Sequence, residues 1–499
     1  MRLLLYWTAA LIVMAGDALA QTGRWTRAES PGFIVYSTAS EQRITGVVEE
    51  LESFDALLRR MTNAPAERSP TKLEVFLLSS NQFEDAFPSA RDTIRGIYSA
   101  RPDQIGAFAI FSDSYGLDAQ EVLFHEYAHH FMFQYFANAY PTWYVEGFAE
   151  FVQTAVMGSE RIVLGRSADA RAQSLFNEIW LPMETLITAA PGTLSPDDAA
   201  KFYAQSWLFV HYLTVTPGKL ERFQAYIRAL RLGQEAEAAF ETGFGMTPDQ
   251  MQGELRRYLR RSPNAIALTR PTLIRHSAIT MTRLPQSADR LLPHAARLRR
   301  GVPNDQAAAL LGRVRELSTS RDEFATLTLA RAEAMLGDTN AARALLEPYL
   351  AANPDSVEGL YLMGLTYLTD AGFHESGRSE VDLQLLAQGR RYLSRAFRID
   401  GNHVPTLYRY AQSYDGVAMD ETTWNNYMNV LLLANQLAPQ IDEISMNAAG
   451  ALIAHGRHRE AIPLLRAVAY DPHAGSGAQR ARQMLQEAEA AVSSAAPAQ

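Results

Sequence analysis

The stretch His-Glu-x-x-His, with His125, Glu126 and His129, constrains this chain more than any other. Two residues four positions apart on a helix project from the same face, about one turn apart. Two imidazoles at that spacing can bind one zinc ion, and the glutamate between them can activate a water molecule on the metal. The motif therefore predicts a catalytic metal site if the rest of the chain supplies a third ligand.

The helix that carries the motif is expected to be buried. It is predicted to run from about Leu117 to Ala137, and most of its surface is apolar apart from the motif. A histidine inside such a helix is costly unless it is hydrogen-bonded or binds a metal. A lone buried histidine usually bonds to backbone groups, so this alternative stays open for His125 and His129 until a third ligand is identified.

A second helix is expected to supply the third ligand. The segment 141–151 reads Pro-Thr-Trp-Tyr-Val-Glu-Gly-Phe-Ala-Glu-Phe, and its proline suits the first turn of a helix. Sixteen residues separate His129 from Glu146, which is enough for a loop and an antiparallel return. Glu146 is the predicted ligand, Gly147 is expected to let the two helices approach closely, and Glu150 to hold a ligand imidazole through its other nitrogen. For either glutamate alone, a solvated helix face is the alternative.

These two segments together resemble the gluzincin metallopeptidases, the clan that includes thermolysin and the aminopeptidase N type, and most of all its smaller peptidase MA-like bacterial members. The resemblance rests on His-Glu-Tyr-Ala-His at 125–129 followed by Trp-Tyr-Val-Glu-Gly-Phe-Ala-Glu at 143–150. In that clan, two histidines and the downstream glutamate bind zinc, and the motif glutamate is the general base. Carried over to this chain, the zinc ligands are His125, His129 and Glu146, and the base is Glu126.

A further stretch, Phe-Tyr-Ala-Gln-Ser-Trp at 202–207, resembles the Tyr-x-Lys-Gly-Ala stretch of aminopeptidase-type gluzincins. The tyrosine of that stretch stabilises the oxyanion of the tetrahedral intermediate, and Tyr203 takes its place here. Gln205 and Ser206 stand where the lysine and glycine would be. A core tyrosine in a helix from Ala199 to Tyr212 is the alternative for Tyr203.

One feature of the aminopeptidases in this clan is missing, a Gly-x-Met-Glu-Asn stretch whose glutamate grips the free amino group of the substrate. The nearest match is Gly-Ala-Phe-Ala-Ile at 106–110, which has neither the glutamate nor the asparagine. Endopeptidase action on a peptide or protein substrate is therefore preferred over N-terminal trimming. The same strand is expected to pair with an extended substrate backbone at the edge of a sheet.

The residues before the motif predict a small mixed sheet with helices. Short β-branched and aromatic runs at 33–36 and 73–78 indicate strands, and 94–98 with 105–111 indicates a strand pair. The spacing of apolar residues over 44–61 indicates an amphipathic helix. The resemblance implies that this sheet and the helices after it form an α+β, zincin-like domain, for which we predict the range 21–262, with a loop-rich stretch at 157–200 near the cleft.

The C-terminal half is predicted to be an all-α solenoid of tetratricopeptide-like repeats over 304–493. Gly337 and Gly456 are each followed five residues later by alanine and about seventeen later by proline. Pro439 and Pro472 are 33 positions apart, close to the 34-residue period of these repeats. A generic helical domain is the alternative. An insertion is expected at 369–388, a proline-punctuated connecting region at 263–303, and a tail at 494–499.

The N-terminus resembles a secretory signal. Arg2 provides a positive start, residues 3–15 are apolar, and Ala-Leu-Ala at 18–20 is a cleavage site. A short membrane anchor is the alternative, but the run ends in Gly-Asp. The chain has no cysteine for a disulfide or lipid anchor and no later stretch apolar enough to span a bilayer. Residues 1–20 are thus a predicted signal peptide, and the mature protein is expected to be exported, either periplasmic or secreted.

Composition agrees with a globular chain and argues against nucleic acid as a partner. Hydrophobic residues make up 47% and charged residues 20%, which is ordinary for folded domains. The net charge is −9, and lysine and arginine are scattered rather than arranged in a stripe.

Two functions follow from these patterns. The first is an exported zinc metallopeptidase that uses Zn²⁺ and Glu126, with the repeats recruiting a protein substrate or partner. The second is a tetratricopeptide-repeat interaction protein whose peptidase-like domain is structural or inactive. The retention of Glu126 favours the first, because a purely structural zinc site has no use for a base.

Overall fold

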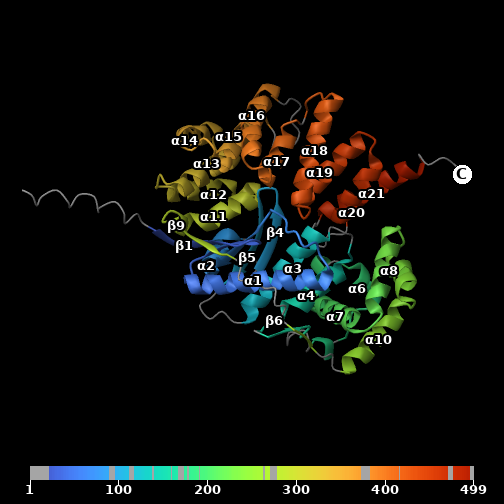
Figure 1. Cartoon of the computed structure of the whole chain (residues 1–499). Helices are drawn as coiled ribbons and strands as arrows, with labels where there is room; N and C mark the ends of the chain where they lie inside the picture. Colours follow the sequence, from blue (N-terminus) through green and yellow to red (C-terminus); the bar gives the residue numbers. More distant parts are fainter. Residues whose placement is uncertain are drawn as a thin grey trace, which may run out of the picture.

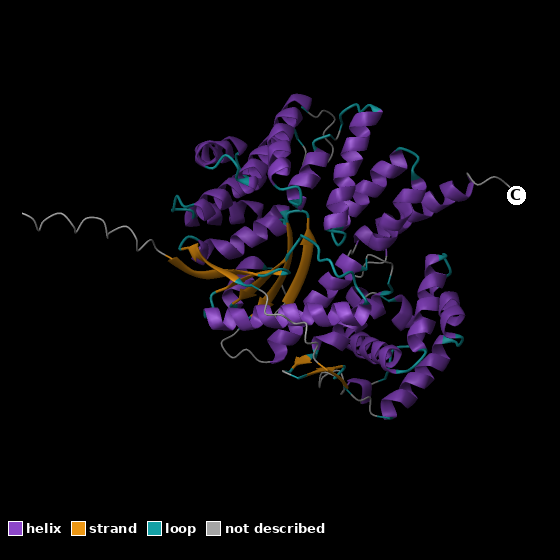
Figure 2. Ribbon diagram, in the orientation of Figure 1, coloured by secondary structure: helices purple, strands orange, loops and turns teal. Residues whose placement is uncertain are grey.

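The structure, a computed structural model, has a central mixed sheet with helices on both faces and a curved row of helices from the C-terminal half (Figures 1 and 2). It describes residues 22–88, 96–111, 117–136, 140–158, 160–166, 174–176, 179–189, 191–261, 265–269, 278–372, 382–414, 416–469 and 476–494. The predicted signal peptide lies outside these residues. Within them, none of the helices combines the length and apolar character that a membrane crossing requires.

The larger sheet has six strands in the order β4-β5-β3-β2-β1-β9. Its strands are β1 Thr22–Glu29, β2 Phe33–Ser37, β3 Leu73–Leu78, β4 Gly96–Arg101, β5 Gln104–Ile110 and β9 Thr280–Pro285. β2, β3 and β5 run parallel to one another, whereas β4, β1 and β9 pair antiparallel with their neighbours. The predicted mixed sheet is therefore present, and the runs at 33–36 and 73–78 form strands as expected.

The strand that was expected at the edge of the sheet is an interior strand. β5 contains residues 106–110 and is hydrogen-bonded to β3 on one side and β4 on the other. The tight turn at Pro102 and Asp103 folds β4 onto the outer side of β5, so β4 occupies the edge. The expectation that 106–110 pairs with a substrate was wrong, because its backbone groups are already used on both sides.

Helices cover both faces of this sheet because its strands are apolar on both sides. Val75 and Leu77 face one core, which includes α1 (Glu41–Thr62) and α3 (Leu117–Tyr135). Phe76 and Leu78 face the other, which includes α2 (Ser80–Ala86) and α11 (Ala288–Arg300). Successive side chains of a strand point to opposite faces, so a single buried run of residues supports two cores.

Helices also follow α3 along the chain, as predicted. They are α4 Thr142–Gln153, α6 Met183–Thr188, η1 Pro191–Thr193, α7 Pro196–Val215, α8 Lys219–Arg231, α9 Ala236–Phe244 and α10 Pro248–Arg260. Trp143 of α4 is fully buried and stacks on Phe209 of α7 at 4.3 Å between ring centroids. This aromatic contact fixes α4 against α7. Whether the sheet and these helices make a zincin fold stays a prediction.

The region expected to connect the two halves contributes to both sheets. β8 (Ile266–Thr269) pairs with β7 (Arg161–Leu164), which also pairs with β6 (Val156–Met157) in a small three-stranded sheet. β9 pairs with β1, and α11 covers the large sheet. Residues 265–269 and 278–300 therefore do not form a plain linker, and the domain boundaries themselves stay predictions.

The C-terminal half is a series of helix pairs. Its helices are α12 Asn304–Leu317, α13 Glu323–Leu336, α14 Thr339–Ala352, α15 Val357–Asp370, α16 Leu383–Ile399, α17 Val404–Gln412, α18 Glu421–Leu437, α19 Asp442–Ala454, α20 His458–Ala469 and α21 Ser476–Ser494. The starts of α13 and α15 are 34 residues apart, as are those of α19 and α21. The interval from α15 to α17 is 47 residues, and the excess falls where the sequence predicts an insertion.

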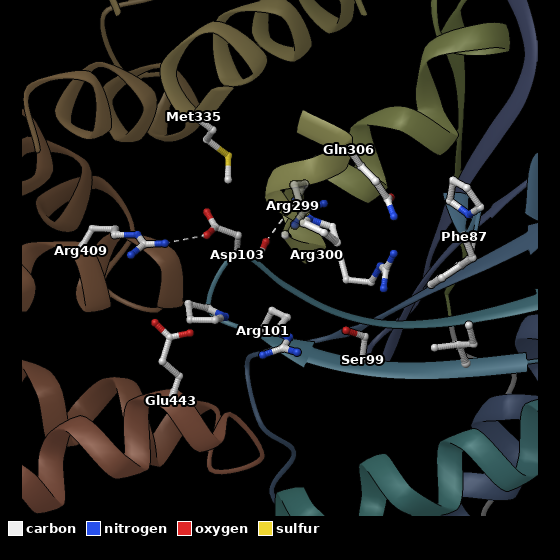
Figure 3. Close-up of a pocket in the computed structure, with 15 residues that line it drawn as sticks. Phe87, Ser99, Arg101, Asp103, Arg299, Arg300, Gln306, Met335, Arg409 and Glu443 are labelled. Atoms are coloured by element: carbon white, nitrogen blue, oxygen red, sulfur yellow. Dashed lines mark hydrogen bonds and ion pairs between the residues drawn. The ribbon is translucent and has the colours of Figure 1, made fainter. Parts of the chain in front are cut away.

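Asp103, in the turn between β4 and β5, joins the sheet to the repeats (Figure 3). Its buried carboxylate accepts hydrogen bonds from Arg331 of α13 at 2.9 Å, from Arg409 of α17 at 3.2 Å, and from the Tyr361 hydroxyl of α15. Arg299 of α11 donates to its backbone carbonyl at 3.1 Å. One carboxylate of the sheet thus binds the first helices of three successive helix pairs.

The charge of Asp103 is stabilised by its partners. Burial alone raises the pKa of this carboxyl, but the guanidinium groups of Arg409 and Arg331 and the Tyr361 hydroxyl outweigh burial and hold the pKa well below its usual value. A carboxyl with a lowered pKa contributes stability above its unfolded pKa and loses it as the pH falls toward the folded pKa. Below about pH 4, acid should therefore weaken the contact between sheet and repeats.

Asp103→Asn is expected to destabilise the protein by about 3–5 kcal/mol, because it removes the carboxylate that two buried guanidinium groups share and leaves only Arg331 with another, that of Glu358. Urea denaturation followed by circular dichroism measures the change. Asp355→Asn, at an exposed carboxylate between α14 and α15, is the control and should change the free energy of unfolding by less than about 0.5 kcal/mol. If the two variants are equally stable, the carboxylate of Asp103 does not hold the halves together.

Candidate metal centre

Helices α3 and α4 bring the three predicted ligands together. The Nε2 atoms of His125 and His129 are 3.0 Å apart. The Glu146 Oε2 atom lies 3.6 Å from the first of these nitrogens and 3.5 Å from the second. Among the described residues, these three form the cluster of side chains that could hold a metal ion.

The separations between these atoms fit one tetrahedral metal ion. Zinc binds imidazole nitrogen and carboxylate oxygen at about 2.0–2.2 Å, so two ligand atoms at the tetrahedral angle are about 3.3 Å apart. The three distances, from 3.0 to 3.6 Å, bracket this value. Two imidazoles and one carboxylate are also a donor set that catalytic zinc uses, with one position left for water. The residues present therefore fit the ion, although its binding stays a prediction.

The electrostatic field at these atoms favours positive charge. Burial alone lowers the pKa of His125, but the Glu146 hydrogen bond and the charges of Glu126 and Glu150 outweigh it and raise the pKa to about 9. Glu146 and Glu150 are themselves buried. The same negative field that favours a proton on His125 also attracts a metal cation to the three ligand atoms.

The outer nitrogen of His125 contacts Gln153 rather than Glu150. The His125 Nδ1 atom lies 3.1 Å from the Gln153 Oε1 atom, and the Gln153 amide donates to Glu150 at 2.8 Å. For His125, the prediction that Glu150 holds the imidazole directly was wrong, because Gln153, one turn further along α4, contacts the outer nitrogen and itself donates to Glu150. Gln153 follows Glu146 by seven residues, two helical turns, so the face of α4 was a signal that sequence reasoning missed.

Glu126 lies where α3 meets the edge strand of the sheet. A Cβ atom placed on Gly96, the first residue of β4, would lie 3.5 Å from the Glu126 Cγ atom and 2.2 Å from Val122. A larger residue at this position would require the Val122 side chain to move, so glycine favours this close approach of β4 to α3. The predicted base is half-buried on the helix that carries the ligands and beside the backbone of an edge strand.

Gly147 faces α7 and not α3. A Cβ atom at this position would lie 2.4 Å from the Ser206 carbonyl oxygen, so the glycine permits the close packing of α4 on α7. The expectation that it serves the contact between α4 and α3 was wrong, because the side chains of Glu146 and Gln153 turn the other side of α4 toward His125. Tyr203 is half-buried, one turn before Ser206 on α7, and its oxyanion role stays a prediction.

Two neighbours of the motif position α3 without joining the ligands. The Tyr127 hydroxyl donates to the buried Asp55 carboxylate of α1 at 2.6 Å. His130 lies 3.3 Å, Nδ1 to oxygen, from the Tyr98 hydroxyl of β4, and burial lowers the pKa of His130 to about 3. These contacts attach α3 to α1 and to the edge strand.

Comparisons with known proteins identify the repeats. Residues 323–366 match the family model for the tetratricopeptide repeat, so the chain contains such a repeat. None of the curated proteins matches the chain. A solved thermophilic TPR protein of Thermus thermophilus is 20% identical with a TM-score of 0.31, over 36% of this chain and 92% of its own. The solved MamA of AMB-1 is 17% identical with a TM-score of 0.27, over 40% of this chain and 98% of its own.

The purified chain is expected to bind about one zinc ion, and His129→Ala to bind almost none after dialysis, because two protein ligands hold zinc poorly. Elemental analysis by mass spectrometry measures the zinc content. His130→Asn is the matched control, because this neighbouring histidine contacts Tyr98 rather than the ligands, and it should retain the metal. Equal zinc in both variants, or none in the parent chain, would contradict the site.

Proposed function

We propose that this protein is an exported zinc-dependent metallopeptidase that hydrolyses bonds within polypeptides. The observation that carries the proposal is the convergence of the ligand atoms of His125, His129 and Glu146, which lie within 4.8 Å of one another. Glu126 supports hydrolysis over a structural role, because a structural zinc site needs no base beside it. Export rests on the N-terminal sequence alone.

The residues of the chain divide the chemistry of hydrolysis among them. Zinc, when bound to the three ligands, polarises the scissile carbonyl and lowers the pKa of water. Glu126 takes the proton of the attacking water and passes it to the leaving amine. Gln153 holds the ring of His125 by a hydrogen bond to its Nδ1 atom, which keeps the Nε2 atom directed toward the space that the three ligand atoms surround. Tyr203 donates a hydrogen bond to the developing oxyanion.

Endopeptidase action is supported by the position of β4. This strand ends the sheet, it pairs only with β5 among the described strands, and it begins beside Glu126. An extended polypeptide that adds to such an edge gains backbone hydrogen bonds along its length and needs no free terminus. The edge of β4 therefore takes the role that was first expected of 106–110.

The second candidate is an interaction protein, and the match of residues 323–366 to a tetratricopeptide repeat supports it. Such repeats suggest protein partners, since stacked helix pairs create extended binding surfaces. Under this alternative, the zinc site stabilises α3 and α4 and no bond is cleaved. Both candidates predict zinc binding, so the role of Glu126 separates them.

Glu126→Gln is expected to reduce the cleavage of casein or of a quenched peptide library by at least about 100-fold, because the amide accepts no proton. Zinc content should stay at the level of the parent chain, since Glu126 is not among the clustered ligands. Release of quenched fluorescence, with and without a chelator, measures the activity. Cleavage by the variant at the parental rate would exclude the proposed mechanism, and an inactive but zinc-loaded parent chain would support the alternative.

Tyr203→Phe is expected to lower kcat by about 100-fold with little change in KM or zinc content, because the hydroxyl acts on the charge that develops during the reaction. The aromatic ring is kept, so the packing of this α7 side chain against the core should be preserved. Tyr140→Phe, at another half-buried tyrosine of the same core, controls for the loss of a hydroxyl. An unchanged kcat would assign Tyr203 to the core alone.

A further inference from the structure

A cavity of about 610 Å³ lies where the sheet, α11 and the repeats meet (Figure 3). Its wall includes Ile97, Ser99 and Arg101, the alternate residues of β4 that point to one face of the sheet. The opposite wall includes Arg300 at the end of α11 and Met335 at the end of α13. The cavity therefore runs along the edge strand of the sheet.

The lining of this cavity carries more positive than negative charge. Four arginines and two acids line it. Asp103 is bound by Arg409 and Arg331, and Arg299 is bound to Glu74 at 2.8 Å. Glu443 accepts a hydrogen bond from a tyrosine hydroxyl at 2.9 Å. The remaining charged residues of the lining are Arg101 and Arg300, which are positive, and Glu443, which is negative.

The guanidinium of Arg300 is partly buried and close to the positive charges of two other arginines. Burial, and then the like charges of Arg297 and Arg101, lower the pKa of Arg300 to about 10. Its guanidinium lies 4.2 Å from the centre of the Phe87 ring and donates to the Ala86 carbonyl at 3.3 Å. Within the described part of the chain, neither Arg101 nor Arg300 forms an ion pair. A carboxylate entering the cavity would relieve this repulsion and could accept hydrogen bonds from both.

The ligand is identified as a polypeptide by the strand that lines the cavity. β4 ends the sheet, so its outer backbone groups face a position where an extended chain can add. The side chains of an added strand alternate in direction, and one set would share the face of Ser99 and Arg101. An acidic side chain of that set would enter the cavity directly opposite Arg101.

We propose that Arg101 and Arg300 recognise an acidic side chain of an extended polypeptide that pairs with the edge of β4. Gly96, beside Glu126, is five residues from Arg101, about 17 Å along a strand. The bound acid therefore lies about five residues from the bond presented to the metal centre. The proposal rests on the proposed function only in naming this polypeptide as the substrate, because binding itself needs no cleavage.

The test measures binding in the full chain carrying Glu126→Gln, which should bind without cleaving. The probe is a fluorescent twelve-residue peptide with glutamate at alternate positions, and the comparison peptide has glutamine at the same positions. Fluorescence anisotropy should give a dissociation constant at least about tenfold lower for the acidic peptide. This preference should weaken as salt is added, because the contacts involve charge near the surface.

Arg101→Gln and Arg300→Gln are each expected to raise the dissociation constant of the acidic peptide about tenfold and to leave that of the glutamine peptide unchanged. Arg101 is exposed, so its replacement does not threaten folding. The matched control is Arg228→Gln, at an exposed arginine on α8, which should bind like the parent. Equal affinity for the two peptides, or an equal loss in all three variants, would overturn the proposal.

Product sequencing separates this proposal from the peptidase function. If the parent chain cleaves peptides without preferring an acid about five residues from the cut, and Arg101→Gln cleaves alike, the cavity proposal fails while the peptidase function stands. If nothing is cleaved but the acidic peptide binds through Arg101 and Arg300, the peptidase function fails while the cavity proposal stands.

Discussion

One buried carboxylate at the tip of the hairpin of β4 and β5 connects the two halves of this protein. Asp103 is surrounded by Arg331, Arg409 and Tyr361, each from the first helix of a different helix pair. A buried carboxylate is unfavourable unless it is paired and hydrogen-bonded, so the hairpin is stable in this position only with the repeats in place. The repeats therefore stabilise the chain's own sheet. They hold β4 in place, and its first residue, Gly96, lies beside Glu126.

This connection gives the repeats a structural role within the chain itself. Ile97, Ser99 and Arg101 of β4 line the cavity between the sheet and the repeats. The first residue of the strand, Gly96, lies beside Glu126 at the candidate metal centre. Because the strand is attached to α3 at one end and to the repeats at the other, a polypeptide bound along it would touch both halves of the protein. Under the proposed function, a substrate recruited by the repeats would therefore bind next to the sheet rather than on a distant surface.

Much of the local structure could be predicted because it depends on short spacing. The strands at 33–36 and 73–78, the helix that carries the motif and the 34-residue repeat are all set by neighbouring residues. The ligand cluster was also predictable, because a four-residue spacing fixes two side chains and one loop brings in the third. The partner of the outer nitrogen of His125 was not, since the choice between Glu150 and Gln153 depends on how far α4 is rotated against α3.

The sequence alone determined which chemical groups are available, namely two imidazoles and two carboxylates on adjacent helices, followed by helical repeats. Only the tertiary structure decided the order of the strands, which put β4 rather than β5 at the edge. It also decided that Gly147 packs on α7. It brought together at one cavity four arginines from distant parts of the sequence, namely Arg101, Arg299, Arg300 and Arg409. The physical reason is that strand order and helix contacts depend on which distant surfaces exclude water together, and no local spacing encodes that choice.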